Sequence, residues 1–136
     1  MKPIVADIMN PKLLYLAEGS RADLAREPIL KLGVTAVPVL DPEGRPVGVV
    51  SLRDLASGKG AVEPTAPAFT IVSTASVEAA ARAIAETDYR HLVVVDEKTG
   101  RAVGMLSAMD VIRAMLDMPP RHPAPSAALA DAPPKG

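Results

Sequence analysis

Short apolar runs separated by turn residues divide the chain into two similar halves. Runs that are rich in β-branched residues and too short for helices predict buried strands at Val34–Leu40 and Leu92–Val95. A turn that begins with Asp and ends with Gly follows each run, and a second apolar run comes next, at 46–50 and at 102–106. The pattern therefore predicts one β-hairpin in each half.

A helical pattern precedes each hairpin. The apolar positions of 77–87 fall on one face of a helix, whereas the pattern over 21–32 is interrupted by Pro28, which should kink or shorten that helix. Ser20 and Ser76 stand where N-caps are expected. The second half is therefore predicted to be the more regular one.

Two further elements complete each half. A short strand is predicted before each helix, at 12–16 and at 69–72, and a closing helix is predicted from about 108 to 118, ended by Pro119 and the proline after it. Each half then reads β-α-β-β-α. The predicted fold class is α+β, with strands and helices in α/β layers.

The two halves are related as an internal repeat. At a shift of 55–56 residues, Gly44–Leu55 aligns with Gly100–Val111, and six of the twelve pairs are identical, where chance would give about one or fewer. One extra residue in the second turn accounts for the change of shift. The predicted division is repeat 1 at 1–57, a Gly- and Pro-containing linker at 58–67, repeat 2 at 68–118 and a disordered Pro- and Ala-rich tail at 119–136.

Composition excludes several classes of function. The chain has 15 Lys and Arg against 16 Asp and Glu, a net charge of -1, so it lacks the basic footprint of a nucleic-acid-binding protein. It has no cysteine, which excludes disulfides, thiolate metal sites and cysteine nucleophiles. No apolar run is long enough to span a membrane, and Asp7 comes too early for a secretory signal. We expect a cytoplasmic protein with no membrane partner.

The repeated piece reads Gly, two apolar residues, Ser, two variable residues, Asp, at the point where a strand gives way to a helix. Its polar and glycine positions are Gly48, Ser51 and Asp54 in the first half and Gly104, Ser107 and Asp110 in the second. Two interpretations are open. The Ser and Asp can form a capping box, which the spacing alone favours. Alternatively, the helix N-terminus and the Ser hydroxyl can bind phosphate, the Asp can accept bonds from ribose hydroxyls, and the glycine can let a ligand approach the backbone.

The order of elements, the duplication and the doubled Gly-apolar-apolar-Ser-x-x-Asp piece resemble a tandem pair of CBS domains. The opening Asp7-Ile8-Met9 is similar to that family's opening, and Tyr89–Asp96 is similar to its strand after the first helix. Val34–Asp41 keeps the family's Pro-Val at Pro38. The resemblance implies a stand-alone CBS-domain protein whose two repeats pack as a pseudo-two-fold pair.

The resemblance also implies a function. It implies a regulatory, energy-sensing module that binds an adenosine-containing ligand in clefts between the two halves: AMP, ADP, ATP or S-adenosylmethionine, and less often NAD or cyclic dinucleotides. No cofactor is implied as required. Asp54 and Asp110 would hold ribose hydroxyls, and Ser51 and Ser107 would contact phosphate or ribose. The remaining lining positions, mostly through their backbone, would be Val34, Thr35, Val37, Pro38, Tyr89 and Leu92.

The two predicted sites differ in charge. Arg90 and His91 are the expected phosphate-binding residues, because a guanidinium fork matches phosphate geometry. The equivalent positions of the first half are Thr35 and Ala36, which carry no charge, so the stronger phosphate site is expected in the second half. The alternative for Arg90 is an ordinary surface arginine paired with a neighbouring carboxylate, Asp88 or Glu86; the alternative for His91 is a half-exposed histidine at a strand edge.

No motif predicts catalysis. The sequence contains no nucleophile elbow, no phosphate-binding Walker loop and no paired metal-binding histidines, so no catalytic or metal-ligating residue is predicted. A second class of function stays open, a ligand-free dimerisation or interaction scaffold. Under either interpretation we expect a homodimer. In the regulatory case the chain would act on a separate protein partner or sense a ligand by itself. In the regulatory case the mechanism would be a shift of conformational population by the ligand.

Overall fold

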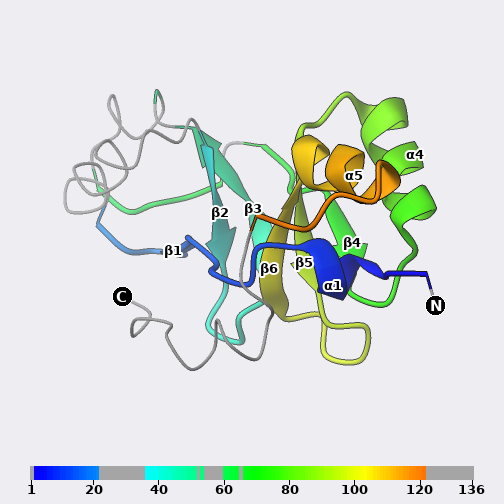
Figure 1. The fold of residues 1–136 in the computed structure, drawn as a ribbon. Helices are drawn as coiled ribbons and strands as arrows, with labels where there is room; N and C mark the ends of the chain where they lie inside the picture. The colour runs from blue at the N-terminus through cyan, green and yellow to red at the C-terminus, as the bar shows by residue number, and fades with distance from the viewer. Residues whose placement is uncertain (1, 22–35, 52, 54–59, 65, 122–136) are drawn as a thin grey trace. The chain divides into compact units, whose positions relative to one another are not determined.

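The computed structural model describes residues 2–21, 36–51, 53, 60–64 and 66–121. The chain forms two compact units (Figure 1). Unit 1 consists of Met1–Leu13 together with Phe69–Gly136, and unit 2 consists of Leu14–Ala68. The N-terminal segment therefore belongs to the unit that holds the second repeat, whereas the sequence division had placed it at the start of repeat 1.

The described part of unit 1 contains a three-stranded sheet, three helices and one hairpin. Its elements are α1 (Val5–Ile8), β4 (Thr70–Val72), α4 (Val77–Thr87), β5 (His91–Val95), β6 (Ala102–Ser107) and α5 (Ala108–Met115). The strand order is β4-β5-β6, with β4 parallel to β5 and β6 antiparallel to β5. Helix α4 provides the crossover connection that a parallel pair of strands needs. Strand β5 lies between β4 and β6 and is the central strand.

Unit 2 repeats the sheet of unit 1. Its strands are β1 (Leu16–Ala17), β2 (Ala36–Leu40) and β3 (Pro46–Ser51), in the order β1-β2-β3. Strand β1 is parallel to β2, and β3 is antiparallel to β2. The described strands of both halves therefore confirm the predicted α+β class and the duplicated hairpin.

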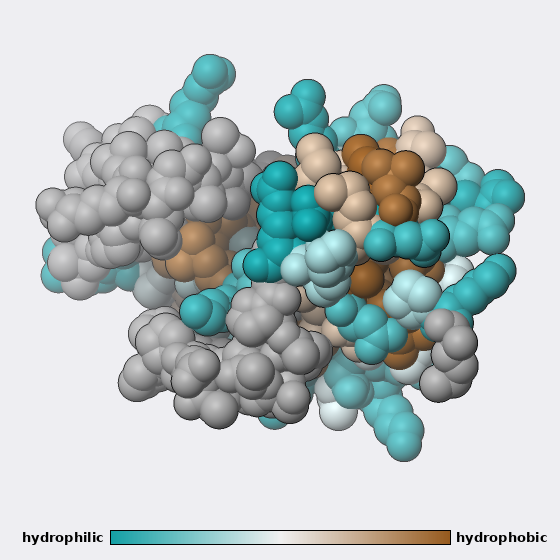
Figure 2. Space-filling model, viewed as in Figure 1, coloured by the Kyte–Doolittle hydropathy of each residue, from teal (hydrophilic) through white to brown (hydrophobic). Residues whose placement is uncertain are grey.

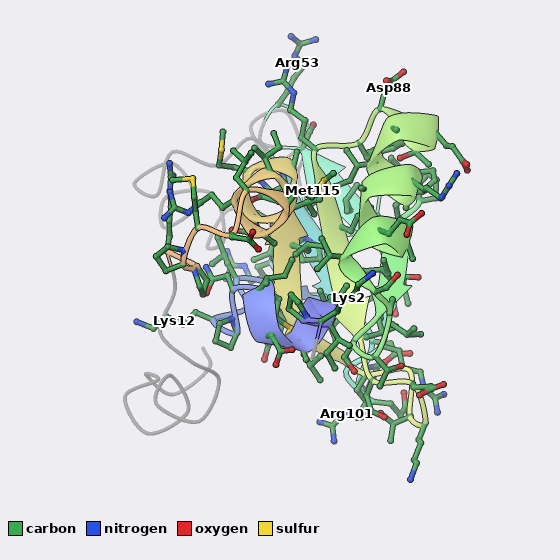
Figure 3. All side chains as sticks on the ribbon, turned by 45° about the vertical axis from the view of Figure 1, so that its right-hand side comes forward. Lys2, Lys12, Arg53, Asp88, Arg101 and Met115 are labelled. Atoms are coloured by element: carbon green, nitrogen blue, oxygen red, sulfur yellow. The ribbon has the colours of Figure 1, made fainter. Side chains whose placement is uncertain are left out.

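Helix α4 has the predicted bounds and local capping at both ends. The Ser76 hydroxyl oxygen accepts a hydrogen bond from the Ala79 N–H at 3.0 Å, as an N-cap should. At the other end, Asp88 adopts a left-handed conformation with φ of 60°, and Figure 3 shows its side chain just past the end of the helix. Ala80 is fully buried, and the ion pair between Arg82 and Glu78 lies on the exposed face. The single buried face holds the helix against the sheet.

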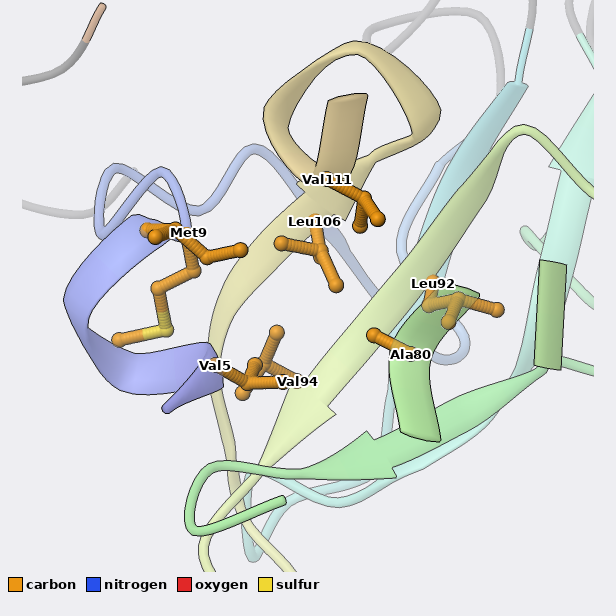
Figure 4. Packing of buried hydrophobic residues seen from close by; sticks show 8 residues of the cluster. Val5, Met9, Ala80, Leu92, Val94, Leu106 and Val111 are labelled. Atoms are coloured by element: carbon orange, nitrogen blue, oxygen red, sulfur yellow. The ribbon is translucent and has the colours of Figure 1, made fainter. Parts of the chain in front are cut away.

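The core of unit 1 joins the N-terminal segment to the second repeat. Figure 4 shows Val5 and Met9 packed with Val94 and Leu106 of the sheet and Val111 of α5. Val5, Val94 and Leu106 have no exposed surface. A Val-rich cluster fills unit 2, and its buried members are Val37, Val39, Val50 and Val62. Val62 lies inside the segment that composition indicated as a linker, so part of that segment is core.

The bounds of β1 and α5 differ from the prediction by more than one residue. Strand β1 is Leu16–Ala17 rather than the predicted 12–16, and Pro38 of β2 has no N–H with which to extend the ladder before Leu16. In unit 1 the equivalent Val93 donates its N–H to the Phe69 carbonyl at 2.8 Å. Helix α5 ends at Met115 rather than near 118. The Arg113 side chain binds the Pro119 carbonyl there, through Nε at 3.0 Å and Nη2 at 2.7 Å.

Some predictions fall on residues that the structure does not describe. The helix predicted over 21–32 lies almost wholly within 22–35, which is outside the described residues, and so are most of 52–59 and the end of the tail, 122–136. Ser20 is described, and its hydroxyl donates to the Ala17 carbonyl at 2.7 Å. Its predicted role as the N-cap of that helix stays a prediction.

Candidate functional site

The two repeated serines stand at the same place in the two hairpins. Ser107 is the last residue of β6 and lies opposite His91, the first residue of β5. Ser51 is the last residue of β3 and lies opposite Ala36. The register thus confirms the sequence alignment that made Ala36 the counterpart of His91.

Ser107 and Asp110 form a capping box at the start of α5. The Asp110 N–H donates to the Ser107 Oγ at 3.1 Å, and the Ser107 N–H donates to the Asp110 Oδ2 at 2.8 Å. Asp110 is 7% exposed, so both bonds are largely shielded from water. The capping interpretation is therefore confirmed for the second repeat. It leaves the Ser107 hydroxyl proton available for donation, since Oγ acts only as an acceptor in the cap.

The hairpin brings Arg90 and His91 to this helix start. The Ala108 N–H donates to the Arg90 carbonyl at 2.8 Å, so the backbone before β5 is bonded to the first residue of α5. Both the Arg90 and the His91 side chains are exposed. Asp88 and Glu86 are both described residues, and neither forms an ion pair with Arg90. His91 begins the central strand of its sheet, so it lies at a strand end rather than at a sheet edge.

Tyr89 makes an aromatic contact that composition did not suggest. Its ring stacks on Phe69 with the centroids 4.0 Å apart and the planes inclined by 29°. Tyr89 remains 41% exposed beside Arg90. Phe69 immediately precedes β4, whose parallel pairing with β5 explains the approach. Phe69 is therefore a positioning residue for Tyr89 that sequence reasoning missed, and only the predicted strand pairing could have indicated it.

The two repeated glycines lie close against other segments of the chain. A Cβ at Gly104 would lie 2.7 Å from the Asn10 carbonyl oxygen and 2.7 Å from the Met9 Sδ. A Cβ at Gly48 would collide with the Pro64 Cβ and lie 2.7 Å from the Ala66 carbonyl oxygen. Segments of the chain itself occupy the space beside both glycines. Each glycine therefore has an intramolecular reason, because the chain itself makes the close approach. Their contact with a ligand stays a prediction.

The other predicted site residues divide into two groups. The side chains of Val37 and Leu92 are each 1% exposed and belong to the cores of their units, and Pro38 is buried too, so only their backbones could contact a ligand. Asp54, Val34 and Thr35 lie outside the described residues. The structure thus brings together Tyr89, Arg90, His91, Ser107 and Asp110 in the second repeat.

Among the carboxylates that the structure describes, Asp96 has a clearly perturbed pKa, and it lies at the opposite end of the hairpin. The backbone N–H groups of Thr99 and Lys98 donate to the Asp96 Oδ1, each at 2.9 Å, and they hold the pKa of Asp96 below its usual value of 3.8. These bonds order the turn between β5 and β6. They are not part of the candidate site around Ser107.

Within the described part of the chain, no three His, Asp or Glu side chains are grouped so that they could hold a metal ion. None of the described helices is long and apolar enough to cross a membrane.

The chain contains two copies of one three-stranded sheet, and the last strand of each copy ends in the repeated Ser. This duplication defines a tandem-repeat module. The chain belongs to the CBS domain family: the model of the CBS domain matches residues 5–58 and again residues 60–117. The fold matches CBS-pair structures as well. CBSX2 in complex with AMP is 32% identical, covers 84% of this chain and 96% of its own, and superposes with a TM-score of 0.69. A structure of CBSX2 from Arabidopsis thaliana is 29% identical, covers 86% of this chain and 96% of its own, and superposes with a TM-score of 0.70.

Longer curated proteins contain a similar region. Homoserine O-acetyltransferase of Methanococcoides burtonii is 29% identical over 115 residues, which are 80% of this chain and 23% of that protein. The magnesium transporter MgtE of Thermus thermophilus is 42% identical over 55 residues, 38% of this chain and 11% of the transporter. This chain spans less than a quarter of the length of either relative.

Proposed function

We propose that this protein is a regulatory module that binds an adenosine-containing ligand and passes a conformational change to a separate protein. The solved CBSX2 complex with AMP, at 32% identity, supports this class of ligand. ADP, ATP, S-adenosylmethionine and NAD belong to the same class. No reaction is proposed, because neither repeat carries a motif that predicts catalysis.

The observation that carries the proposal is the pairing of His91 with Ser107 beside the start of α5. The backbones of Arg90 and His91 lie next to Ala108 and Ser107 at the start of α5, whose N-terminus is the positive end of the helix dipole. A guanidinium fork and a helix N-terminus both suit phosphate oxygens. The ligand's phosphate is therefore assigned to Arg90, His91 and Ser107, and Tyr89 is assigned to the rim of the same site.

Asp110 has a double role in this proposal. Its Oδ2 holds the Ser107 N–H, so the carboxylate keeps the turn in shape whether or not a ligand is bound. Its role toward ribose hydroxyls is part of the proposal. In the first repeat, Ala36 stands where His91 stands, so a ligand there would lack this contact to its phosphate. We therefore propose one strong site and one weak or empty site.

Regulation would follow from differential affinity. A ligand that binds better to one arrangement of the module shifts the equilibrium toward that arrangement. At saturation, the equilibrium constant between the two arrangements changes by the ratio of the two affinities. The regulated protein would then read which arrangement is populated.

The test is calorimetry of the purified protein with AMP, ADP, ATP, S-adenosylmethionine and NAD, repeated on Arg90→Ala. For the ligand that binds, Arg90→Ala should weaken affinity by about tenfold or more, since charge-assisted bonds contribute about 1.5–3 kcal/mol. Arg101→Ala is the matched control: an exposed arginine at the other end of the same hairpin, which should leave affinity unchanged. Equal affinities of wild type and Arg90→Ala would overturn the assignment of phosphate to Arg90.

One observation favours a second candidate, the homodimeric scaffold. Helix α5 and the residues after it expose large apolar side chains, and Figure 2 shows this hydrophobic surface over α5. Met109, Ile112 and Leu116 recur along one face, with Met115 beside them 64% exposed (Figure 3). A second copy of the chain is a suitable partner for an uncharged apolar face. If no adenosine ligand binds and the protein sediments as a dimer, the scaffold replaces the sensor.

A further inference from the structure

Each repeat is preceded by a short segment that packs on the other repeat's strands. The first, which we call leading segment A, is Ile4–Asn10; the second, leading segment B, is Gly60–Pro64 with Ala66. Segment A precedes the strands of repeat 1 in the chain but belongs to unit 1, which holds repeat 2. Segment B precedes the strands of repeat 2 but belongs to unit 2, which holds repeat 1.

The two segments make the same backbone contacts. In unit 1, Asn10 and Met105 exchange two hydrogen bonds, at 2.8 and 2.9 Å. In unit 2, Ala66 and Val49 exchange two, at 2.9 and 3.3 Å. Met105 stands two residues before Ser107, and Val49 stands two residues before Ser51. Each segment therefore forms an additional short bridge on the strand that ends in the repeated serine.

The repeated glycines make this approach possible. Gly104 leaves room for the Asn10 carbonyl and the Met9 side chain, and Gly48 leaves room for Pro64 and Ala66. In both repeats the tight neighbour includes a backbone oxygen, which cannot turn aside as a flexible side chain can. The glycine of the Gly-apolar-apolar-Ser piece is thus explained by the leading segment that crosses it.

Each segment also inserts one valine into the core that it crosses. Val5 of segment A is fully buried and donates its N–H to the Ala75 carbonyl at 2.8 Å. Val62 of segment B is 1% exposed and donates its N–H to the Ser20 carbonyl at 2.6 Å. Ala75 and Ser20 both lie just before the first helix position expected in their repeat. Each segment thus joins the strand that carries the serine to a residue near the predicted start of a helix, Ala75 in repeat 2 and Ser20 in repeat 1.

We propose that the leading segments are crossed positioning elements: segment A holds the Ser107–Asp110 turn of repeat 2 in shape, and segment B holds the end of β3 at Ser51 in repeat 1. The physical reason is that β6 and β3 are the outer strands of their three-stranded sheets, so the leading segment is the outer partner of the strand that presents each serine. A change in either turn is then passed along the chain to the first strand of the other repeat.

The proposal has a consequence for ligand binding, which rests on the proposed function. A ligand at Arg90 and Ser107 would stabilise segment A, and by reciprocity a stabilised segment A would favour that ligand. The segment leads directly to β1 of the other unit. Covalent continuity therefore gives a physical route from an occupied second repeat to the first.

The test uses the matched pair Val5→Ala and Val62→Ala, which remove the same atoms from equally buried positions. Amide hydrogen exchange of the full chain without ligand is followed at Ser107 and Asp110, whose N–H groups form the capping box, and at Val49–Ser51. Val5→Ala should accelerate exchange at Ser107 and Asp110 by about tenfold or more and change Val49–Ser51 by less than about twofold. Val62→Ala should show the reverse.

Either of two results would overturn the proposal: equal acceleration at both turns in both variants, or acceleration confined to the repeat that follows the mutated segment in sequence. If an alanine variant does not fold, Val5→Thr and Val62→Thr keep the side-chain volume and are read in the same way. These exchange measurements are made without ligand. A nucleotide titration that shows no binding would therefore overturn only the proposed function, and either of the two exchange results above would overturn only this inference.

Discussion

The hairpins of the two repeats share one register and differ at one chemically important pair. Val39 lies opposite Gly48 and Val94 opposite Gly104, and both ladders shift register at the next residue along β2 and β5. At the open end, however, Ser51 faces Ala36 whereas Ser107 faces His91. The repeated residues thus specify backbone packing in both halves, whereas the charged groups of the candidate site, Arg90 and His91, lie at positions that are not repeated.

The first strands of the two repeats differ for a similarly local reason. Val93 bonds to Phe69, which lets β4 begin at Thr70, whereas Pro38 cannot make the equivalent bond and β1 begins only at Leu16. One residue thus makes the first sheet less complete than the second. Stability measurements can show whether the two hairpins are equally important to the fold despite this difference.

The largest expected effect comes from Leu106→Ala compared with Val50→Ala. The two positions are equivalent in the repeat, and the side chains are 0% and 3% exposed. Leu106→Ala should lower the free energy of unfolding by about 3 kcal/mol, because it removes more buried atoms and leaves a larger cavity. Val50→Ala should cost about 2 kcal/mol, from two lost methyl groups and a smaller cavity. Urea unfolding monitored by circular dichroism measures both.

A surface change on α5 is the control for that pair. Met115→Ala alters a side chain that is 64% exposed and should change the free energy of unfolding by less than about 0.5 kcal/mol in the monomer. If Val50→Ala is as costly as Leu106→Ala or more so, the first repeat contributes at least as much stability as the second, despite its shorter first strand.

A smaller effect is expected from the caps, with Asp110→Ala compared with Asp54→Ala. Asp110→Ala removes the acceptor of the Ser107 N–H and should cost about 1–2 kcal/mol in the absence of ligand. If the box is repeated in the first half, Asp54→Ala should cost the same. An unchanged urea midpoint for Asp110→Ala would contradict the structural role of the cap, and a loss confined to Asp110→Ala would mean that only the second repeat uses it.

This cap changes how a binding experiment on Asp110 is interpreted. Asp110→Ala should weaken the fold under the sensor and scaffold interpretations alike, so lost ligand affinity in that variant could reflect a disturbed turn. Arg90 is the sharper probe, because its guanidinium makes no ion pair with the neighbouring Asp88 or Glu86, both of which are described. Its removal should leave stability nearly unchanged while it changes phosphate affinity.

Much of the fold could be predicted because its signals are local. The bounds of α4 follow from Ser76 and the alanine-rich face, and the hairpins follow from β-branched runs and Asp-to-Gly turns. The repeat alignment made Ala36 the counterpart of His91, and the register agrees, since Ala36 lies opposite Ser51 as His91 lies opposite Ser107. The family could be predicted too, since the doubled motif and the order of elements both depend on short-range patterns.

The remaining features depend on contacts between residues far apart in the sequence. Nothing local to Gly104 indicates that the Asn10 carbonyl lies against it, so the glycine invited a ligand-binding interpretation. Val62 is surrounded by Gly, Pro and Glu, which concealed its place in a core. The stacking of Tyr89 on Phe69 likewise depends on strand pairing across α4.

The smallest expected effect is the pH dependence of the turn between β5 and β6, in the hairpin of the second repeat. The lowered pKa of Asp96 means that the folded state favours its carboxylate, so this contribution is fully present above the usual value of 3.8 and is lost as pH falls through the lower folded value. Below about pH 3.8, the amide resonances of Lys98 and Thr99 should therefore move toward unfolded positions before the core does. Asp96→Asn keeps an acceptor oxygen but cannot titrate, so the same resonances should stay constant. An identical transition in that variant would show that another group controls the turn.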